Sequence, residues 1–149
     1  MLFFHELEGC RNGRFQHDGA FGAGSAHVIV GFSHAGKHVK GARVAILGFT
    51  FKENCPDVRN TKVIDIYKEL KEYDVDITVF DPWASPSVVE QEYGILITNK
   101  LPAGKFDACI GAVAHNEFKE LDILCLLKDK HVVFDVKCTI DRNIVDGRL

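Results

Sequence analysis

Closely spaced cysteine pairs, long apolar runs and an excess of charge of one sign are all missing from this sequence. Its five cysteines never form a C-x-x-C pair, the spacing that zinc ribbons and redox motifs need. No apolar run approaches the roughly 18 residues of a membrane span. The net charge of −3 removes the electrostatic argument for binding nucleic acid or an anionic membrane. We therefore expect a cytoplasmic protein with reduced thiols and with no nucleic-acid or membrane partner.

The composition is that of one globular domain preceded by a different kind of segment. Of the 149 residues, 46% are hydrophobic and 26% charged, but the first 40 residues hold seven of the 13 glycines and five of the seven histidines. Residues 9–24 show no periodicity and are predicted to be loop or disordered, whereas residues 28–30 suit a strand or a helical turn. We expect residues 1–35 to be a disordered or unrelated leader and residues 36–149 to form the domain.

From residue 41 onward, strand-like and helix-like segments alternate. Residues 43–49 are β-branched, apolar and nearly continuous, which is typical of a strand buried on both faces of a parallel sheet. A helix with an apolar stripe is predicted from Asn60 and Thr61, as N-cap residues, to about Tyr73. The other predicted strands are 76–80, 95–98, 106–113 and 131–136, and the other predicted helices are 85–93 and 117–127. This alternation predicts an α/β fold: a Rossmann-like, doubly wound parallel sheet in three α/β/α layers.

The turn after the first strand is the candidate binding site, because ligands of such sheets bind beyond the carboxyl ends of the strands. A dinucleotide-binding turn would carry G-x-G-x-x-G there, but only Gly48 is present. The turn instead supplies an aromatic ring, Phe51, two cations, Lys52 and Arg59, and a helix start. Together these suit a base or sugar face and a phosphate. The alternative is that both cations are solvated loop charges and that Phe51 plugs the core.

Several separated segments occur in a characteristic order: K-G-A-R-V-A-I-L-G-F-T-F-K-E-N-C-P-D-V-R-N-T-K-V at 40–63, D-P-W at 81–83, A-V-A-H-N-E-F at 112–118, F-D-V-K at 134–137 and D-G-R-L at 146–149. With these segments, about residues 36–149 resemble the C-terminal, UDP-binding domain of the UDP-glucose/GDP-mannose dehydrogenase family. The form K-E-N-C-P-D resembles the branch that oxidises UDP-N-acetylhexosamines to uronic acids, which are precursors of surface polysaccharides.

The resemblance implies roles for particular residues. Phe51 and Lys52 match the Phe-Lys pair that contacts the UDP-sugar, and Lys137 is the nearest match to a basic residue that approaches the nucleotide. Asp57 and Arg59 match an Asp-x-Arg that we interpret as fixing the loop and the helix start. The UDP-sugar-binding residues predicted in this way are Phe51, Lys52, Arg59 and Lys137.

The parent enzyme that this resemblance implies uses NAD, bound by a separate domain, to oxidise C6 of the sugar. Neither that domain, nor the family's long central helix, nor its catalytic cysteine in a G-F-G-G-x-C setting has a counterpart here. Residues 21–26 resemble that setting only superficially. We therefore expect the chain alone to be inactive, with no catalytic residue, cofactor or metal of its own.

The alternative to part of an enzyme is a non-catalytic module that binds nucleotide sugars or serves assembly. A homodimer or larger homo-oligomer stays open, as does the choice between UDP-N-acetylglucosamine and UDP-N-acetylgalactosamine.

Other chemistry-bearing residues form weaker patterns. Cys55 lies in a cationic turn, but no histidine is placed by the sequence to serve it as a base. His34 and His38 have the i, i+4 spacing of a helical metal chelate without an acidic third ligand nearby. His115, at the end of a predicted strand, is either a ligand contact or a structural histidine. Trp83 is interpreted as a packing or subunit-contact residue.

Overall fold

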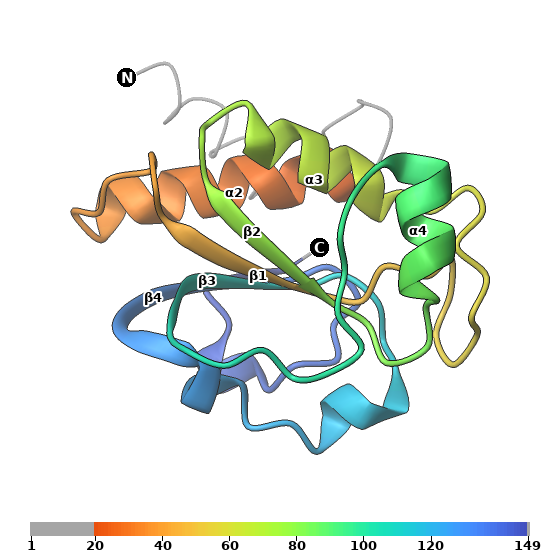
Figure 1. Ribbon diagram of the computed structural model, residues 1–149. Helices are drawn as coiled ribbons and strands as arrows, with labels where there is room; N and C mark the ends of the chain where they lie inside the picture. Colours follow the sequence, from red (N-terminus) through yellow and green to blue (C-terminus); the bar gives the residue numbers. More distant parts are fainter. Residues whose placement is uncertain (1–19, 149) are drawn as a thin grey trace.

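The computed structural model describes the chain from Ala20 to Arg148, and its strands form one parallel sheet (Figure 1). The strands are β1 (Arg43–Leu47), β2 (Asp76–Phe80), β3 (Phe106–Gly111), β4 (Leu127–Asp135) and β5 (Gly147–Arg148). The α-helices are α2 (Ala20–His34), α3 (Val63–Lys71) and α4 (Pro86–Tyr93), and the 3-10 helices are η1 (Asn116–Lys119), η2 (Ile123–Leu126) and η3 (Arg142–Ile144). The strand order is β2-β1-β3-β4-β5, so it reverses between β1 and β3. The predicted Rossmann-like α/β fold is confirmed.

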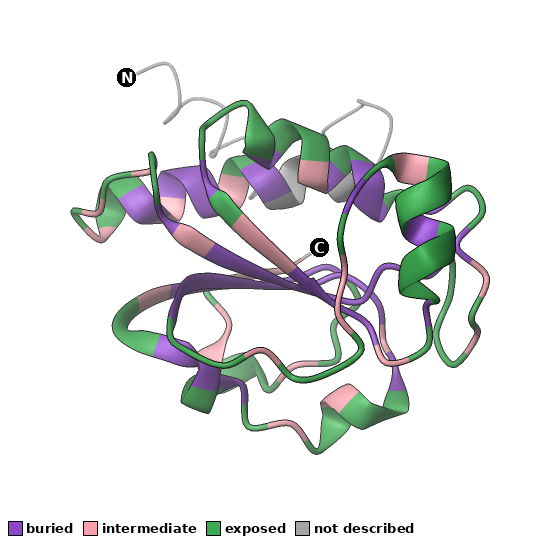
Figure 2. Cartoon of the chain, in the orientation of Figure 1, coloured by how far each residue is buried: buried purple, intermediate pink, exposed green. Residues whose placement is uncertain are grey.

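The two faces of the sheet are covered differently. On one face α2, α3 and α4 pack with the sheet around a core that includes Val28, Ile66 and Val89 from the helices and Ile46 from β1. On the other face, the cover between Ala20 and Arg148 consists of 3-10 helices and the segment 140–145 rather than α-helices. Figure 2 shows the central strands β1 and β3 buried along most of their length, with exposed residues on the outer sides of the helices.

Helix α2 corrects the prediction that residues 9–24 are loop or disordered, because its first five residues fall in that range. Val28 and Phe32, four residues apart, are fully buried, and α2 packs against α3 and β4. A Cβ at Gly31 would lie 2.7 Å from Val132 Cγ1, so the helix sits directly on β4. This packing offsets the cost of glycine in a helix, about 1 kcal/mol each. Helix α2 therefore packs on the sheet through residues such as Val28 and Phe32, and residues 1–19 lie outside the described chain.

The predicted helix over 117–127 is wrong: η1 and η2 occupy this segment, and β4 already begins at Leu127. The apolar residues that face the core are Phe118, Leu121, Ile123 and Leu126. The step of two residues between Leu121 and Ile123 does not fit one face of an α-helix, and the chain breaks into two tighter turns.

Two smaller differences concern strands. Residues 95–98 do not form a strand, since Thr98 makes only a single bridge to Phe80. Strand β5 was not predicted because two residues are too short to carry a periodic pattern. In contrast, β2 has its predicted bounds, and α3 buries Val63, Ile66 and Leu70 of its apolar stripe. No helix between Ala20 and Arg148 is long and apolar enough to cross a membrane.

Candidate functional site

The loops that leave β1 and β3 meet at the point where the strand order reverses. Gly48, the first residue after β1, has a φ of 98°, and a Cβ there would lie 2.5 Å from Val113 Cβ and 2.9 Å from Val113 N. Only glycine fits both this backbone conformation and this close approach. The chain that leaves β1 is thereby fixed against the end of β3, at the position where open α/β sheets bind ligands.

Asp81, directly after β2, holds the chain that leaves β1. Its side chain is fully buried. One carboxylate oxygen, Oδ2, accepts hydrogen bonds from the backbone N–H groups of Phe49 at 2.6 Å and Thr50 at 3.1 Å. The other, Oδ1, accepts from the N–H groups of Trp83 at 2.7 Å and Ala84 at 2.9 Å. One carboxylate therefore fixes the start of the candidate loop and the turn that leads into α4.

His115, which follows β3, completes this buried network. Its Nε2 lies 2.9 Å from Asp81 Oδ2 and 3.1 Å from Thr50 Oγ1, and its Nδ1 accepts a hydrogen bond from the backbone N–H of Asn54 at 3.0 Å. Because Nδ1 is an acceptor, the hydrogen of the neutral ring is on Nε2, which donates to Asp81. Burial opposes ionisation of Asp81, but the hydrogen bonds from His115 and from backbone N–H groups lower the pKa of Asp81 overall.

The loop carries an exposed aromatic ring and an ion pair. The Phe51 side chain is 57% exposed, while its backbone N–H donates to the carbonyl of Asp57 at 2.7 Å. The Arg59 guanidinium donates to both carboxylate oxygens of Asp57 at 3.0 Å each and lowers the pKa of Asp57 to about 2. A hollow of about 160 Å³ is lined by Phe51, Asp57, Arg59 and Asn60. The structure thus brings Phe51 and Arg59 together, and the Arg59 guanidinium forms an ion pair with the Asp57 carboxylate.

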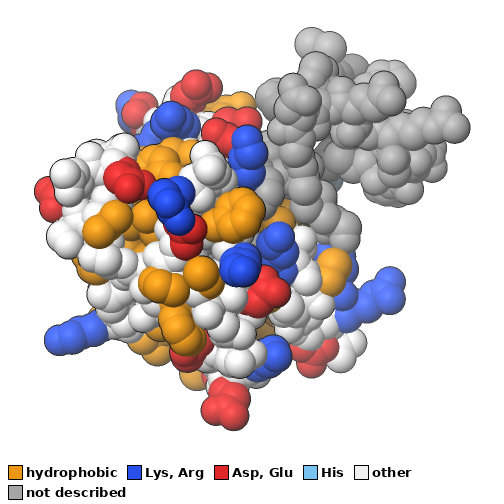
Figure 3. All heavy atoms as spheres, turned by 90° about the vertical axis from the view of Figure 1, so that its right-hand side faces the viewer, with side chains coloured by type: hydrophobic (Ala, Val, Ile, Leu, Met, Phe, Trp, Pro, Cys, Tyr) orange, Lys and Arg blue, Asp and Glu red, His pale blue; other side chains and the backbone are white. Residues whose placement is uncertain are grey.

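The two predicted lysines lie farther apart along the same edge. Lys52 is exposed on the loop after β1, and Lys137 is exposed after β4, two strands away in the sheet. Neighbouring strands are about 4.8 Å apart, so the ends of β1 and β4 are separated by about 10 Å. Figure 3, which faces the side at the right of Figure 1, shows hydrophobic side chains interspersed with Lys and Arg and with Asp and Glu. That edge therefore combines apolar surface with charges of both signs.

Comparison with known proteins matches the sequence of this chain to a family. The family model for the UDP-glucose/GDP-mannose dehydrogenase family, UDP binding domain, matches residues 45–142. The chain belongs to this family. It is 44% identical over 128 residues to the UDP-N-acetyl-D-glucosamine 6-dehydrogenase of Salmonella typhi, covering 84% of this chain and 30% of the relative. It is 50% identical over 115 residues to the Pseudomonas aeruginosa protein of the same name, covering 75% of this chain and 27% of the relative.

The fold agrees with this family membership. The structure of an NDP-N-acetyl-D-galactosaminuronic acid dehydrogenase from Methanosarcina mazei Go1 superposes with a TM-score of 0.74 at 19% identity. The superposition covers 97% of this chain and 36% of that chain. The chain therefore spans less than a third of the length of these two curated relatives and corresponds to the UDP-binding domain of the dehydrogenase family.

Sequence reasoning missed the buried network that positions the loop of this UDP-binding domain. Asp81 was noted only as part of the D-P-W segment after the strand 76–80, and the role of His115 was left open between ligand contact and structure. The structure buries the His115 side chain completely, so it lies behind the loop rather than on the surface. An aspartate directly after a strand, followed by a turn with several free N–H groups, was the signal available for Asp81. The helical chelate of His34 and His38 is not formed, because α2 ends at His34.

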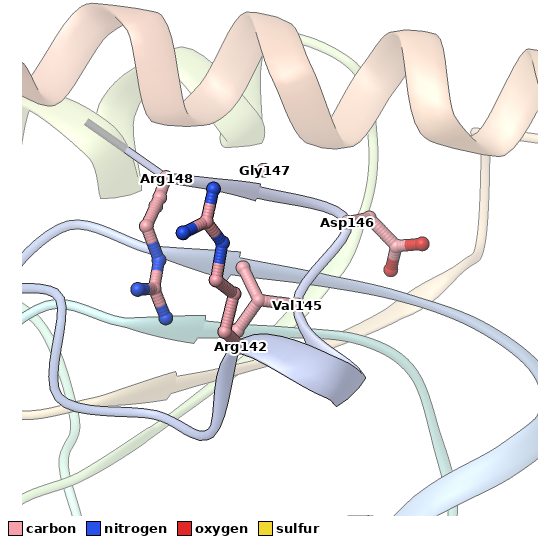
Figure 4. A pocket seen from close by; sticks show the side chains of 5 residues that line it. All are labelled: Arg142, Val145, Asp146, Gly147 and Arg148. Carbon is pink, nitrogen blue, oxygen red and sulfur yellow. The ribbon is translucent and has the colours of Figure 1, made fainter.

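A second hollow lies beside β5, and Figure 4 shows its lining. Its volume is about 290 Å³, and it is lined by Arg142, Val145, Asp146, Gly147 and Arg148. The Arg148 guanidinium donates to the carbonyl of Ile140 at 2.7 Å and lies 3.5 Å from the buried carboxylate of Asp135. Asp146 points away from both arginines and accepts a hydrogen bond from the N–H of Val133 at 2.7 Å. These contacts fix the segment 136–148 to β4.

Proposed function

We propose that this chain binds the UDP part of a UDP-sugar at the carboxyl edge of its sheet. It would serve as the substrate-holding domain of an NAD-dependent nucleotide-sugar 6-dehydrogenase, with the oxidation completed by other parts of such an enzyme. The proposed substrate is a UDP-N-acetylhexosamine, because both relatives compared above are named for UDP-N-acetyl-D-glucosamine. The uronate formed would be a precursor of surface polysaccharide.

The observation that carries this proposal is the exposure of Phe51 on a loop that is fixed at its base. A large aromatic ring that is 57% exposed does not plug the core, as the alternative interpretation required. Its backbone is nevertheless held, because Phe49 and Thr50 are bonded to Asp81 and Phe51 itself is bonded to Asp57. An exposed ring on an ordered loop is suited to stack against uracil or ribose.

The charged residues would divide the remaining contacts. Lys52 and Lys137, on either side of the end of β3, would compensate the charge of the diphosphate. Arg59 would contact the UDP-sugar at the rim of the hollow. Through its ion pair with Asp57 it would also keep Phe51 in place. In this way the domain would orient the sugar towards the catalytic part of the enzyme.

The turn after β1 does not fit NAD. A dinucleotide-binding turn uses glycines so that the backbone can approach the pyrophosphate. Here the space beside Gly48 is filled by Val113, and the rest of the turn carries the Phe51 ring and the Asp57–Arg59 pair. We therefore assign NAD to a domain other than this one.

An assembly module is the second candidate, because several large apolar side chains are exposed outside the loop. Leu96 is 75% exposed and Leu101 49%, and Trp83 is 40% exposed although its indole N–H is bonded to Glu117. Such side chains are suited to contact another subunit, and homo-oligomerisation is part of this proposal. Sedimentation of the Leu96→Asp variant tests it. If the chain assembles through this surface, the variant should sediment as a smaller species than the unmodified chain.

Calorimetric titration with UDP-N-acetylglucosamine, and with NAD as the control ligand, tests the binding function. We expect binding of the UDP-sugar and none of NAD. Lys52→Ala should weaken binding about tenfold, since one charge-assisted contact contributes about 1.4 kcal/mol or more. Lys40→Ala, an exposed lysine at the amino edge of the sheet, is the matched control and should bind normally. Equal affinities of the two variants would contradict the assignment of Lys52.

A further inference from the structure

The loop that presents Phe51 and Lys52 is tied to the rest of the domain at its tip as well as at its base. Its residues 51–57 contain no helix or strand, and most of them are exposed. The tip is held by Asn54, whose N–H donates to His115 Nδ1 at 3.0 Å and whose Oδ1 accepts the N–H of Asn116 at 3.0 Å. The tip is therefore tied to the chain that leaves β3.

We propose that His115 is a positioning residue for the UDP-sugar: its neutral imidazole clips the tip of the 51–57 loop so that Phe51 and Lys52 face the ligand. This inference rests on the proposed function and adds a residue that does not itself touch the ligand. Both ring nitrogens are used in the clip, because Nε2 is bonded to Asp81 and Thr50 at the base of the loop while Nδ1 is bonded to Asn54 at its tip. One ring therefore sets the position of both ends of the short segment that carries Phe51 and Lys52.

The clip works in one protonation state only. An imidazolium carries a hydrogen on Nδ1 as well as on Nε2, so Nδ1 would confront the N–H of Asn54 with a second donor. The hydrogen bond to the loop tip therefore requires that Nδ1 carries no hydrogen.

The groups that surround the His115 ring hold it in this orientation. Asp81 approaches from the end of β2 and is the charged group within hydrogen-bond distance among the residues that the structure describes. The rings packed against the imidazole are those of Trp83, at 6.3 Å between centroids, and Phe118, at 5.4 Å. Glu117 accepts a hydrogen bond from the indole N–H of Trp83 at 3.1 Å.

Two substitutions separate the contact of His115 with Asn54 from its contact with Asp81. In His115→Asn the amide oxygen replaces Nδ1 and can still accept the N–H of Asn54, but the contact with Asp81 is lost. In His115→Gln the amide nitrogen replaces Nε2 and can still donate to Asp81, but the acceptor for Asn54 is lost. Both variants leave a cavity and lose an aromatic contact, so each is the other's control for destabilisation.

The first measurement is the affinity for UDP-N-acetylglucosamine at about pH 8. We expect His115→Gln to bind about five- to tenfold more weakly than His115→Asn. The unmodified chain should bind at least as tightly as His115→Asn. Equal affinities of the two variants would overturn the proposal.

The second measurement needs no ligand. The protection factor of the Asn54 amide against hydrogen exchange, followed by NMR, should be high in the unmodified chain and in His115→Asn and low in His115→Gln. If the UDP-sugar binds none of the proteins while Asn54 behaves in this way, the clip stands and the proposed function fails. If Asn54 is equally protected in all of them, the clip itself is refuted even where binding is observed.

Discussion

The Nε2 atom of His115 and the Oδ2 atom of Asp81 lie 2.9 Å apart, and both side chains are fully buried. The two residues follow β3 and β2, which are the two neighbours of β1 in the sheet. Their contact therefore crosses the path of the chain that leaves β1. Thr50 contacts both residues: its N–H is bonded to Asp81, and its hydroxyl lies 3.1 Å from His115 Nε2. Three loops that are distant in sequence are thereby joined at the proposed UDP-sugar site.

Removal of the carboxylate at the centre of this junction should be strongly destabilising. Asp81→Ala leaves the N–H groups of Phe49, Thr50, Trp83 and Ala84 without their acceptor. A broken buried network of this kind costs about 3–5 kcal/mol of unfolding free energy. Urea denaturation measures it, with the exposed Asp129→Ala as the control, for which we expect a change below about 0.5 kcal/mol. A loss below about 1 kcal/mol for Asp81→Ala would contradict the role given to this carboxylate.

Stability should fall as the pH falls below the ordinary range of aspartate. Asp107, at the start of β3, is bonded to Lys37, Lys128 and the N–H of Arg43; burial opposes its ionisation, but these contacts lower its pKa overall. The pKa of Asp81 is lowered as well. A carboxyl with a lowered folded pKa contributes stability that is present above its unfolded pKa of about 3.9 and is lost as the pH falls through the folded value.

Urea denaturation between pH 7 and pH 2.5 checks this prediction. The unfolding free energy should decrease from about pH 5 downward. Asp107→Asn should be less stable than the unmodified chain at pH 7, and the difference between them should shrink in acid. A constant difference across this range would show that the ionised carboxylate at Asp107 does not contribute.

The sequence predicts those parts of the fold that depend on residues close together in the chain, and misses those that depend on tertiary contacts. β2 was predicted with its observed bounds because its apolar run ends at Asp81 and Pro82 in the sequence. The apolar stripe of α3 was predicted because its spacing is also a local pattern. The helicity of residues 20–24 was missed because glycines there disfavour a helix locally, whereas the packing of α2 on β4 is a tertiary contact.

The candidate site likewise has a part that local sequence predicts and a part that depends on contacts between distant residues. Phe51, Lys52 and Arg59 lie in one short segment, so the sequence alone brings them together, and the structure places Phe51 and Arg59 at one hollow. His115 is 65 residues from Thr50 and 61 from Asn54 along the chain. Their contact depends on β1 and β3 being neighbours, which no local pattern encodes. The contacts of the four predicted residues with a UDP-sugar stay a prediction.

Gly48 should not tolerate a side chain. In Gly48→Ala the new Cβ would lie 2.5 Å from Val113 Cβ, and the residue would keep a φ of 98° that L-residues rarely adopt. Gly94→Ala is the matched control, since its φ is 69° but nothing lies within 4 Å of its Cβ position. We expect about 1 kcal/mol of destabilisation for Gly94→Ala, from the backbone alone, and about 3 kcal/mol or more for Gly48→Ala. Urea denaturation of both variants measures the difference, and equal losses would show that the contact with Val113 is not tight.

Phe51 should matter for the ligand and not for the fold. Because its ring is 57% exposed, Phe51→Ala removes little buried apolar surface, and we expect the unfolding free energy to change by less than about 1 kcal/mol. The same substitution removes the proposed stacking surface and should weaken UDP-N-acetylglucosamine about tenfold in a calorimetric titration. Leu124→Ala, at a 45% exposed residue on η2, is the control and should leave the affinity unchanged. A stable Phe51→Ala variant with normal affinity would remove the observation on which the proposed function rests, because the exposed ring would then have no part in binding.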